Sequence, residues 1–466
     1  MLRILATTSL LPLLVVSGLQ TAQKTNRSKK DNMVLDIQGL KTLCYQFFNF
    51  IPRTIRILFC LTFLIYNYLY SQPLTLRDVI IEAKKNNPTL IKAEKSVKLA
   101  RLQYQSSFTN FLPQLSANAG VSQTDSDGSC WSKGYSYGFS GKLSVFSGFS
   151  DISNTSSKNI QLSIAETDYK KTLSNTVFNL KKSFMELLWS QESVKLAQEI
   201  LKRRTENYEL VKFKYDAGRE DRGSLLRVEA DKYQAEYELS KAKRSVVSAS
   251  SELLKDMGRD SNSVSEIPTA AGSFTLDESM PVPVFGEVLL NIPDYVIAKN
   301  NLEKSEYDLT SAKSQLYPEI SLSGSASKTG DRWTLSNDNR SVSLGLSYPF
   351  FPGGRNYYDI KISQTNKVIL EEAFRSTRQQ LVSTLSSVWN DFINAVESVK
   401  VSQMYFLAAQ EQSKITSTKY INGLTSYQDW YTVENDFTNS QRSLLNAKKN
   451  AVIAEANWKN VIGMVE

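Results

Sequence analysis

The side chains that could carry out acid–base or nucleophilic chemistry are few in this 466-residue chain. It contains no histidine, which excludes His-based general bases, Ser-His-Asp triads and His-ligated zinc or haem sites. Two of its three cysteines, Cys44 and Cys60, precede residue 72, so Cys130 alone cannot form a Cys-rich metal site. The paired carboxylates Glu220 and Asp221 fall on a predicted helix-hairpin turn, where solvated charges are expected. The sequence therefore predicts neither an enzyme nor a resident metal or other cofactor.

The positive charge of the chain is concentrated near its N-terminus. The formal net charge is +8, from 55 Lys and Arg against 47 Asp and Glu. Residues 1–71 hold eight of the basic residues and two of the acidic ones, which leaves +2 for the remainder. A nucleic-acid-binding protein needs a basic surface, and residues 72–466 carry too little net positive charge to provide one. We therefore expect no nucleic acid among its partners.

Residues 1–71 are predicted to be a leader that is removed. Two apolar runs, Ile4–Leu19 and Ile55–Tyr70, each follow basic residues as in a signal peptide, and both are shorter than the roughly 20 residues of a spanning helix. We interpret Arg53–Ser71 as the working signal, with translation starting at Met33 or later; the alternative is a double-anchored N-terminus. From residue 72 onward there is no run of 18 apolar residues, so any later membrane crossing must use strands.

Six short motifs recur in the chain, always 205 residues apart. Matches at one constant offset indicate a tandem duplication. We divide the chain into a first repeat over residues 72–258, a Ser/Pro/Gly-containing linker over 259–279 and a second repeat over 280–466. The matching motifs begin at Asn86 and Asn291, Leu112 and Tyr317, Phe146 and Phe351, Lys214 and Lys419, Val228 and Val433, and Met257 and Ile462.

Each repeat is predicted to run helix, strand, strand, long helix, turn, helix. The first helical stretch, Leu76–Phe111, should break at Pro88, because proline lacks the amide hydrogen that a helix needs. The stretches Asp151–Tyr215 and Asn356–Tyr420 lack Pro and Gly and show coiled-coil patterning. At 1.5 Å per residue, each predicts a helix of about 100 Å. The shorter helices should stack end to end beside the long ones.

The predicted strands alternate between apolar residues and mostly Ser or Gly; they lie at 114–123, 135–145, 320–327 and 341–350. Their length suits a tilted strand that crosses a bilayer, and the Ser/Gly face suits a water-filled lumen. A sheet packed on a soluble core would show the same period. Four strands cannot close a barrel. Two copies would give eight strands with a filled interior, whereas three give twelve with a lumen. The predicted fold is therefore a mixed α/β membrane protein: a trimeric 12-stranded outer-membrane β-barrel continued by a long α-helical coiled-coil barrel.

Several sequence motifs resemble those of the TolC family of outer membrane efflux proteins. These are the opening Leu74-Thr75-Leu76 with Asn86-Asn87-Pro88, the Pro-containing strand starts at Leu112 and Tyr317, the Phe-x-Gly strand ends, and the Lys-Tyr-x-x-Gly turns. The resemblance covers residues 74–463. It implies a homotrimer in outer membrane lipid of a Gram-negative-type cell, with a helical barrel in the periplasm and an equatorial girdle from segments such as 259–285.

The resemblance also implies a passive function. The chain would be the exit duct of a tripartite efflux pump or a type I secretion system. A periplasmic adaptor (membrane fusion) protein would join it to an energy-supplying inner-membrane transporter. The alternative is a structural coiled-coil envelope protein without channel activity.

In the family, the adaptor docks on the two hairpin tips. The matching positions are Ala217, Gly218 and Arg219 in the first repeat, and Asn422, Gly423 and Leu424 in the second. Arg219 and Asn422 depart from the family's hydrophobic pattern at these positions. The glycines could alternatively serve only to end helices.

The family's periplasmic aperture is narrowed by acidic residues after the second tip. The first such position is Asp429, and the next is Thr432, so a second acidic ring is missing. Asp429 could alternatively be an ordinary acid in the first turn of a helix. By charge and position, Asp221 and Arg222 are predicted to be latches that hold the aperture shut. Glu434 falls half a turn from Asp429, so we expect it to be a poor substitute for Asp429 in an acidic ring at the aperture. Glu434→Gln would then serve as the control for Asp429→Asn.

Overall fold

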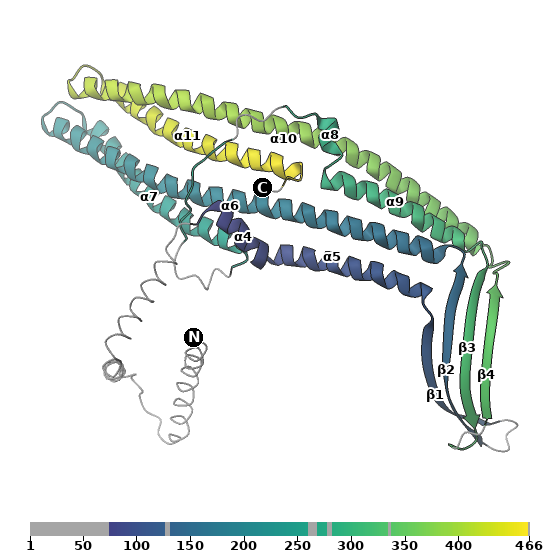
Figure 1. Cartoon of the computed structure of the whole chain (residues 1–466). Coiled ribbons are helices and arrows are strands. Elements are labelled where there is room, and N and C mark those ends of the chain that lie inside the picture. The colour runs from purple at the N-terminus through teal and green to yellow at the C-terminus, as the bar shows by residue number, and fades with distance from the viewer. Residues whose placement is uncertain (1–73, 126–130, 260–267, 277–281, 334–336, 465–466) are drawn as a thin grey trace, which may run out of the picture. The chain divides into compact units, whose positions relative to one another are not determined.

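The computed structural model describes residues 74–464 except 126–130, 260–267, 277–281 and 334–336. The chain divides into two units, 1–72 and 73–466, and every described residue lies in the second. The predicted leader and much of the predicted linker thus lie outside the described residues. Figure 1 labels the elements of the described unit.

The first helical stretch is broken where proline predicts it. Helix α4 spans Leu76–Asn86, α5 spans Pro88–Ser107, and a short 3₁₀ turn, η1, covers Phe108–Phe111. At the break, the Asn87 side chain accepts hydrogen bonds from the amides of Thr89 and Leu90 and so caps α5. Proline is favoured at the first position of a helix, where its missing N–H costs nothing.

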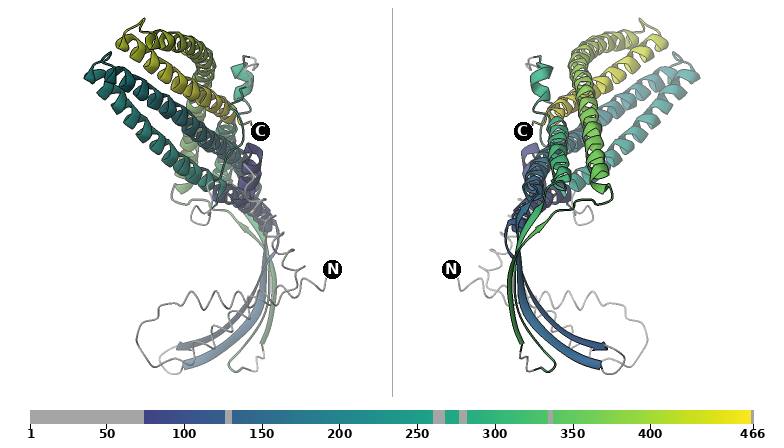
Figure 2. Two further views of the ribbon diagram at one scale, coloured as in Figure 1. Left: turned by 90° about the vertical axis from the view of Figure 1, so that its left-hand side faces the viewer. Right: turned by 90° about the vertical axis from the view of Figure 1, so that its right-hand side faces the viewer.

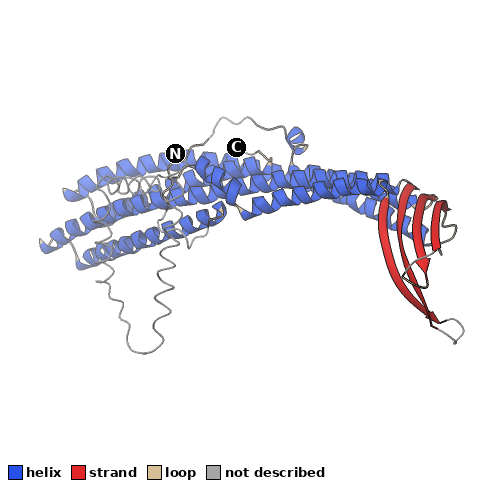
Figure 3. Cartoon of the chain, turned by 60° about the horizontal axis from the view of Figure 1, so that its bottom comes forward, coloured by secondary structure: helices blue, strands red, loops and turns tan. Residues whose placement is uncertain are grey.

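The four predicted strands form one antiparallel sheet in the order β1-β2-β3-β4. They span Gln114–Asp125, Trp131–Ser147, Glu319–Gly330 and Asn337–Ser347. β2 begins earlier than predicted, because residues 131–134 of the expected turn pair with β1. β2 and β3 come from different repeats yet lie side by side, so the two repeats share one continuous sheet. Figure 2 shows the strands as a single curved layer, and Figure 3 places them together at one end of the helices.

Two long helices organise the rest of the unit. α6 spans Ser150–Asp216 and α10 spans Arg355–Ile421, and each has 67 residues. Their starts are separated by the same 205 residues as the sequence motifs, which confirms the duplication. Along α6, α5 packs on one half and α7 (Arg222–Met257) on the other. α9 (Pro293–Ser314) and α11 (Tyr427–Val461) do the same for α10, which confirms the predicted stacking.

The buried apolar residues form three clusters along the helices. The first joins α4, α6 and α7 and includes Val79, Leu187 and Met257. The second joins α10, α11 and the short helix α8 (Phe285–Leu289) around Trp389. The third lies near the hairpin turns and is described below. In the described part of the chain, every helix is too short or too polar to cross a membrane.

Candidate functional site

The two hairpin tips have the same backbone geometry. Gly218 and Gly423 follow the ends of α6 and α10 with φ of 69° and 75°, a region that favours glycine. At the first tip, the Arg219 amide donates to the Lys214 carbonyl at 2.8 Å; at the second, the Leu424 amide donates to the Lys419 carbonyl at 2.8 Å. Together with the glycine amide bonds these form Schellman motifs, which satisfy carbonyls at the helix ends. All six predicted docking residues are exposed: Ala217, Gly218, Arg219, Asn422, Gly423 and Leu424.

Each helix that follows a tip begins with a cap formed by an aspartate and a serine three residues apart. The order of the two residues is reversed between the two hairpins. At α7, the Asp221 carboxylate accepts from the Ser224 amide at 2.9 Å and from the Ser224 hydroxyl at 2.8 Å. At α11, the Ser426 hydroxyl accepts from the Asp429 amide at 3.1 Å and donates to the Asp429 carboxylate at 2.7 Å. The acid is therefore the N-cap in the first hairpin and the third helical residue in the second.

These caps place the three predicted aperture residues. Asp221 is exposed, and its hydrogen bonds from Ser224 lower the pKa of its carboxyl group. Asp429 is also exposed. Arg222 is exposed at the start of α7, and among the described residues no ion pair joins it to Asp221 or Asp429. Within one chain, the structure thus brings the two acids to helix starts at the same end of the molecule without direct contact between them.

A cluster between the two tips, which sequence reasoning missed, connects the hairpins. The Tyr420 ring stacks on Trp430 with centroids 4.4 Å apart, and the Lys214 Nζ lies 3.7 Å from the Tyr420 ring centroid. The Tyr420 hydroxyl donates to Glu220 at 2.8 Å. Burial, with the adjacent Glu220 charge, raises the pKa of Tyr420, and burial lowers the pKa of Lys214. Glu220 therefore is not the freely solvated charge that was expected at this turn.

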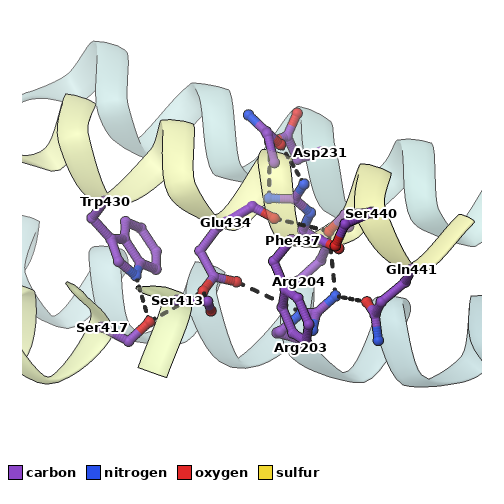
Figure 4. Close-up of polar contacts among 12 residues, drawn as sticks. Arg203, Arg204, Asp231, Ser413, Ser417, Trp430, Glu434, Phe437, Ser440 and Gln441 are labelled. Atoms are coloured by element: carbon purple, nitrogen blue, oxygen red, sulfur yellow. Dashed lines mark hydrogen bonds and ion pairs between the residues drawn. The ribbon is translucent and has the colours of Figure 1, made fainter. Parts of the chain in front are cut away.

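A second polar cluster lies deeper between the hairpins (Figure 4). Glu434 is 3% exposed, and it accepts hydrogen bonds from Ser413 and, at 3.1 Å, from Ser417. The Arg203 Nε lies 3.6 Å from its carboxylate, and the Arg203 guanidinium covers the Phe437 ring at 4.4 Å. Burial lowers the pKa of Arg203. The expectation that Glu434 could serve as a control for Asp429 is thus wrong, since its carboxylate is buried and paired.

A neighbouring pair extends this second cluster towards α7. The Arg204 Nη2 donates to the Asn435 side chain at 2.5 Å, and its Nη1 lies 3.6 Å from the Asp231 carboxylate. The spacing of three residues in α11 could have predicted from the sequence that Glu434 is buried. Trp430, Glu434 and Phe437 recur at intervals of four and three, which places the acid on an apolar face.

The sheet separates polar from apolar side chains as its alternation predicts. Ser116, Ser140, Ser325 and Ser341 occupy one paired row across all four strands. Hydroxyl pairs bridge the strands at 2.7 Å for Ser116 and Ser140 and at 2.8 Å for Ser325 and Ser341. The opposite face carries large apolar side chains that remain solvent-exposed in one chain, including Leu115 (82%), Val342 (82%) and Leu344 (71%).

Comparisons with known proteins agree with this arrangement. A family model described as "Outer membrane efflux protein" matches residues 79–259 and 284–464. The chain is 21% identical to the probable outer membrane lipoprotein SilC of Salmonella typhimurium, over 83% of this chain and 85% of SilC. It is 26% identical to outer membrane protein TolC of Escherichia coli K12, over 31% of this chain and 30% of TolC.

The fold is also similar to a solved structure. The open-state Neisseria gonorrhoeae MtrE outer membrane channel superposes with a TM-score of 0.75 at 20% identity, covering 84% of this chain and 89% of MtrE. The two segments of the family match begin 205 residues apart, the offset that relates the two repeats of the fold. Since this match covers well over half of the chain, the chain belongs to the outer membrane efflux protein family, as its resemblance to the TolC family predicted.

Proposed function

We propose that three copies of this chain form a passive exit duct, with a 12-stranded barrel in the outer membrane and a helical barrel in the periplasm. The observation that carries the proposal is the four-stranded sheet, which has one exposed apolar face and one serine-rich face. Outward apolar residues suit lipid, and inward hydroxyls suit a water-filled lumen.

The edges of the sheet give the reason for more than one copy. β1 and β4 each pair with one neighbour within the chain. An open edge inside a bilayer would leave backbone amides and carbonyls without partners, at a cost of several kcal/mol per group. Pairing β4 of one copy with β1 of the next removes these edges. Three copies give twelve strands and a lumen, whereas eight strands leave an interior that side chains fill.

The duct would receive its cargo from an adaptor and an inner-membrane transporter. The exposed tips Ala217-Gly218-Arg219 and Asn422-Gly423-Leu424 offer equivalent backbone turns at one end of the helices. They are the surface on which a periplasmic adaptor would dock. The transporter would provide the energy, in a tripartite efflux pump or in a type I secretion system.

The same end would form the aperture. Three exposed Asp429 carboxylates around the threefold axis would favour cations there. The contacts of Tyr420 with Glu220 and Lys214 would hold the second hairpin against the first in the closed state. Asp221 and Arg222 would act beside them as charged contacts between copies.

Export would precede assembly. We expect residues 1–71 to be removed, leaving an N-terminus near Gln72. Mass spectrometry of the protein from outer membrane fractions measures this directly. Recovery of intact residues 1–70 would contradict it.

Reconstitution tests the duct. The purified mature chain should run as a trimer in detergent and produce discrete conductance steps in a planar bilayer. A monomeric or non-conducting protein that still binds envelope fractions would instead favour the structural coiled-coil alternative.

A further inference from the structure

The serine-rich face of the sheet contains one basic side chain among its described residues. In β2, Lys142 shares this face with Ser140, two residues earlier. It pairs across the sheet with Gln114 of β1 and Ser323 of β3. Cross-strand partners project to the same side of a sheet. Lys142 is therefore a single cation set among neutral amides and hydroxyls.

The other charge on this face lies some distance from Lys142. Glu319 is the first residue of β3, four residues before Ser323, the partner of Lys142. At about 3.3 Å per residue, that separates the two rows by about 13 Å. Lys142 is exposed, and no carboxylate of the described residues lies within ion-pair distance of it. Among the described residues, its charge is thus not neutralised by an ion pair.

A lysine on the opposite face of the sheet provides a contrast. Lys328 of β3 pairs with Tyr137 of β2, and Tyr137 lies on the same face of β2 as the apolar residues Phe139 and Leu143. Lys142 and Lys328 are thus both exposed lysines of neighbouring central strands, but they lie on opposite faces of the sheet.

We propose that Lys142 gives the barrel lumen a preference for anions, and hence favours the passage of anionic solutes through the outer membrane segment. This inference rests on the proposed trimeric duct, in which three copies of Lys142 form one ring. Rings of Lys or Arg select anions in pores because they raise the local anion concentration. The residues that pair with Lys142 are neutral, and the Glu319 row on the same face lies about 13 Å away along the strands. The ring is opposite in charge to the Asp429 ring proposed for the periplasmic aperture.

Reversal potentials of the full mature trimer test this inference. Recordings across a tenfold KCl gradient would compare the parent with Lys142→Gln, Lys142→Glu and Lys328→Gln. At an ion distance of about 8 Å in water, one charge changes the local ion concentration by roughly twofold to threefold. Each of the three copies loses a charge that raises the chloride concentration and lowers the potassium concentration. We therefore expect the chloride-to-potassium permeability ratio to fall at least about threefold in Lys142→Gln and further in Lys142→Glu. Lys328→Gln should match the parent.

The dependence of selectivity on salt concentration distinguishes an effect of charge in the lumen from an effect of pore size. The Debye length is about 30 Å at 0.01 M and about 3 Å at 1 M salt, so the difference between variants should shrink as the salt concentration rises. Equal reversal potentials for the parent and Lys142→Glu at low salt would overturn the inference while leaving the duct intact. A parent protein that forms no channels would overturn the duct itself, and the inference with it.

Cysteine accessibility checks the facing of residue 142 independently of conductance. In a Cys130→Ser background, Lys142→Cys should react in cells with a water-soluble, membrane-impermeant maleimide. Leu143→Cys, the adjacent residue on the apolar face, should react far more slowly. Equal labelling of the two would show that Lys142 does not face the lumen, and would also overturn the inference.

Discussion

Equivalent residues of the two repeats have similar exposure in the sheet but different exposure and contacts near the hairpin tips. In the sheet, Phe139 and Leu344 are repeat equivalents, and both project from the apolar face. At the tips, Tyr420 is 1% exposed and contacts Lys214 and Glu220, whereas its equivalent Tyr215 is 37% exposed. Duplication thus preserved the backbone of the long helices and of the hairpin turns, while the side chains between the hairpins acquired separate roles.

The long helices show the same divergence on a larger scale. α6 contacts α5, α7, α9 and α11, while α10 contacts mainly α9 and α11. As a result, α10 leaves apolar residues such as Val401 (55% exposed), Met404 (67%) and Tyr405 (70%) uncovered in one chain. In the proposed trimer, neighbouring copies would cover this surface, so the less buried repeat would be the one that depends more on assembly.

The largest expected difference between repeat equivalents is at Glu434 and Glu229. Glu434→Ala leaves the Arg203 guanidinium in a partly buried site without its carboxylate, and removing one partner of a buried pair costs about 3–5 kcal/mol. Glu229 is half-buried, and no ion pair joins it to another described residue, so Glu229→Ala should destabilise the protein by about 1 kcal/mol or less. Urea unfolding followed by circular dichroism measures both. Equal losses of unfolding free energy in the two variants would contradict the proposed difference between the hairpins.

The sheet should respond in the opposite way, with equal effects in both repeats. Leu344→Arg and Phe139→Arg each place a charge on the face proposed to contact lipid, at a cost of about 2–4 kcal/mol near the bilayer midplane. Both should reduce the amount of trimer recovered from outer membranes, as measured on semi-native gels. Ser343→Arg, on the serine-rich face, should still assemble and alter conductance. Failure of Ser343→Arg to assemble together with normal assembly of Leu344→Arg would reverse the assignment of the faces.

A smaller difference is expected between the two tyrosines. Tyr420→Phe removes the hydroxyl that donates to Glu220, and a hydrogen bond to a charged group contributes about 1.5–3 kcal/mol. We expect the second hairpin to exchange its amide hydrogens faster near α11, and the duct to spend more time open in bilayer recordings. Tyr215→Phe is the matched control and should resemble the parent. If Tyr215→Phe opens the duct as much as Tyr420→Phe, the contact with Glu220 does not hold the tips together.

The smallest effect on stability is expected from Asp429→Asn, since asparagine keeps an acceptor for Ser426. If three Asp429 side chains surround the aperture, the variant should lose cation selectivity and resist block by a trivalent cation added from the periplasmic side. Asp221→Asn is the first-hairpin comparison and should change selectivity less, because Ser224 donates to both carboxylate oxygens of Asp221. A larger change from Asp221→Asn would assign the aperture to the first hairpin.

Local pattern in the sequence was sufficient for the strands and the long helices. Residues 341–347 alternate along β4, so the face of each follows from the pleat alone; the prediction of a strand to residue 350 was three residues too long, because β4 ends before Pro349. The constant offset of 205 then carried each assignment from one repeat to the other. The glycines of the tips were equally readable, because Gly218 and Gly423 both occupy positive φ.

The contacts between the hairpins could not be predicted in the same way. The partners of the Glu434 carboxylate come from α6 and α10, and the periodicity of one helix does not predict which of its residues contacts which residue of another helix. Tyr420 and Glu220 likewise meet only once the two hairpins are packed together. Whether three copies bring Asp429 together depends on contacts between copies, which a single chain does not contain.

Disulfide trapping of the sheet edges tests the closed trimeric barrel most directly. Within one chain, β1 and β4 are separated by β2 and β3, about 14 Å at 4.7–4.9 Å per strand, whereas the Cα atoms of a disulfide lie within about 7 Å. In a Cys130→Ser background, Ser116→Cys would be combined in turn with a cysteine at each serine-face position of β4 (Asn337, Asn339, Ser341, Ser343, Gly345 and Ser347), because strands of a closed barrel are staggered by several residues. Oxidation in outer membranes should link copies into covalent trimers in at least one register, while Ser116→Cys with Val342→Cys, on the opposite face, should not. Monomers alone in every combination would contradict the closed trimeric barrel.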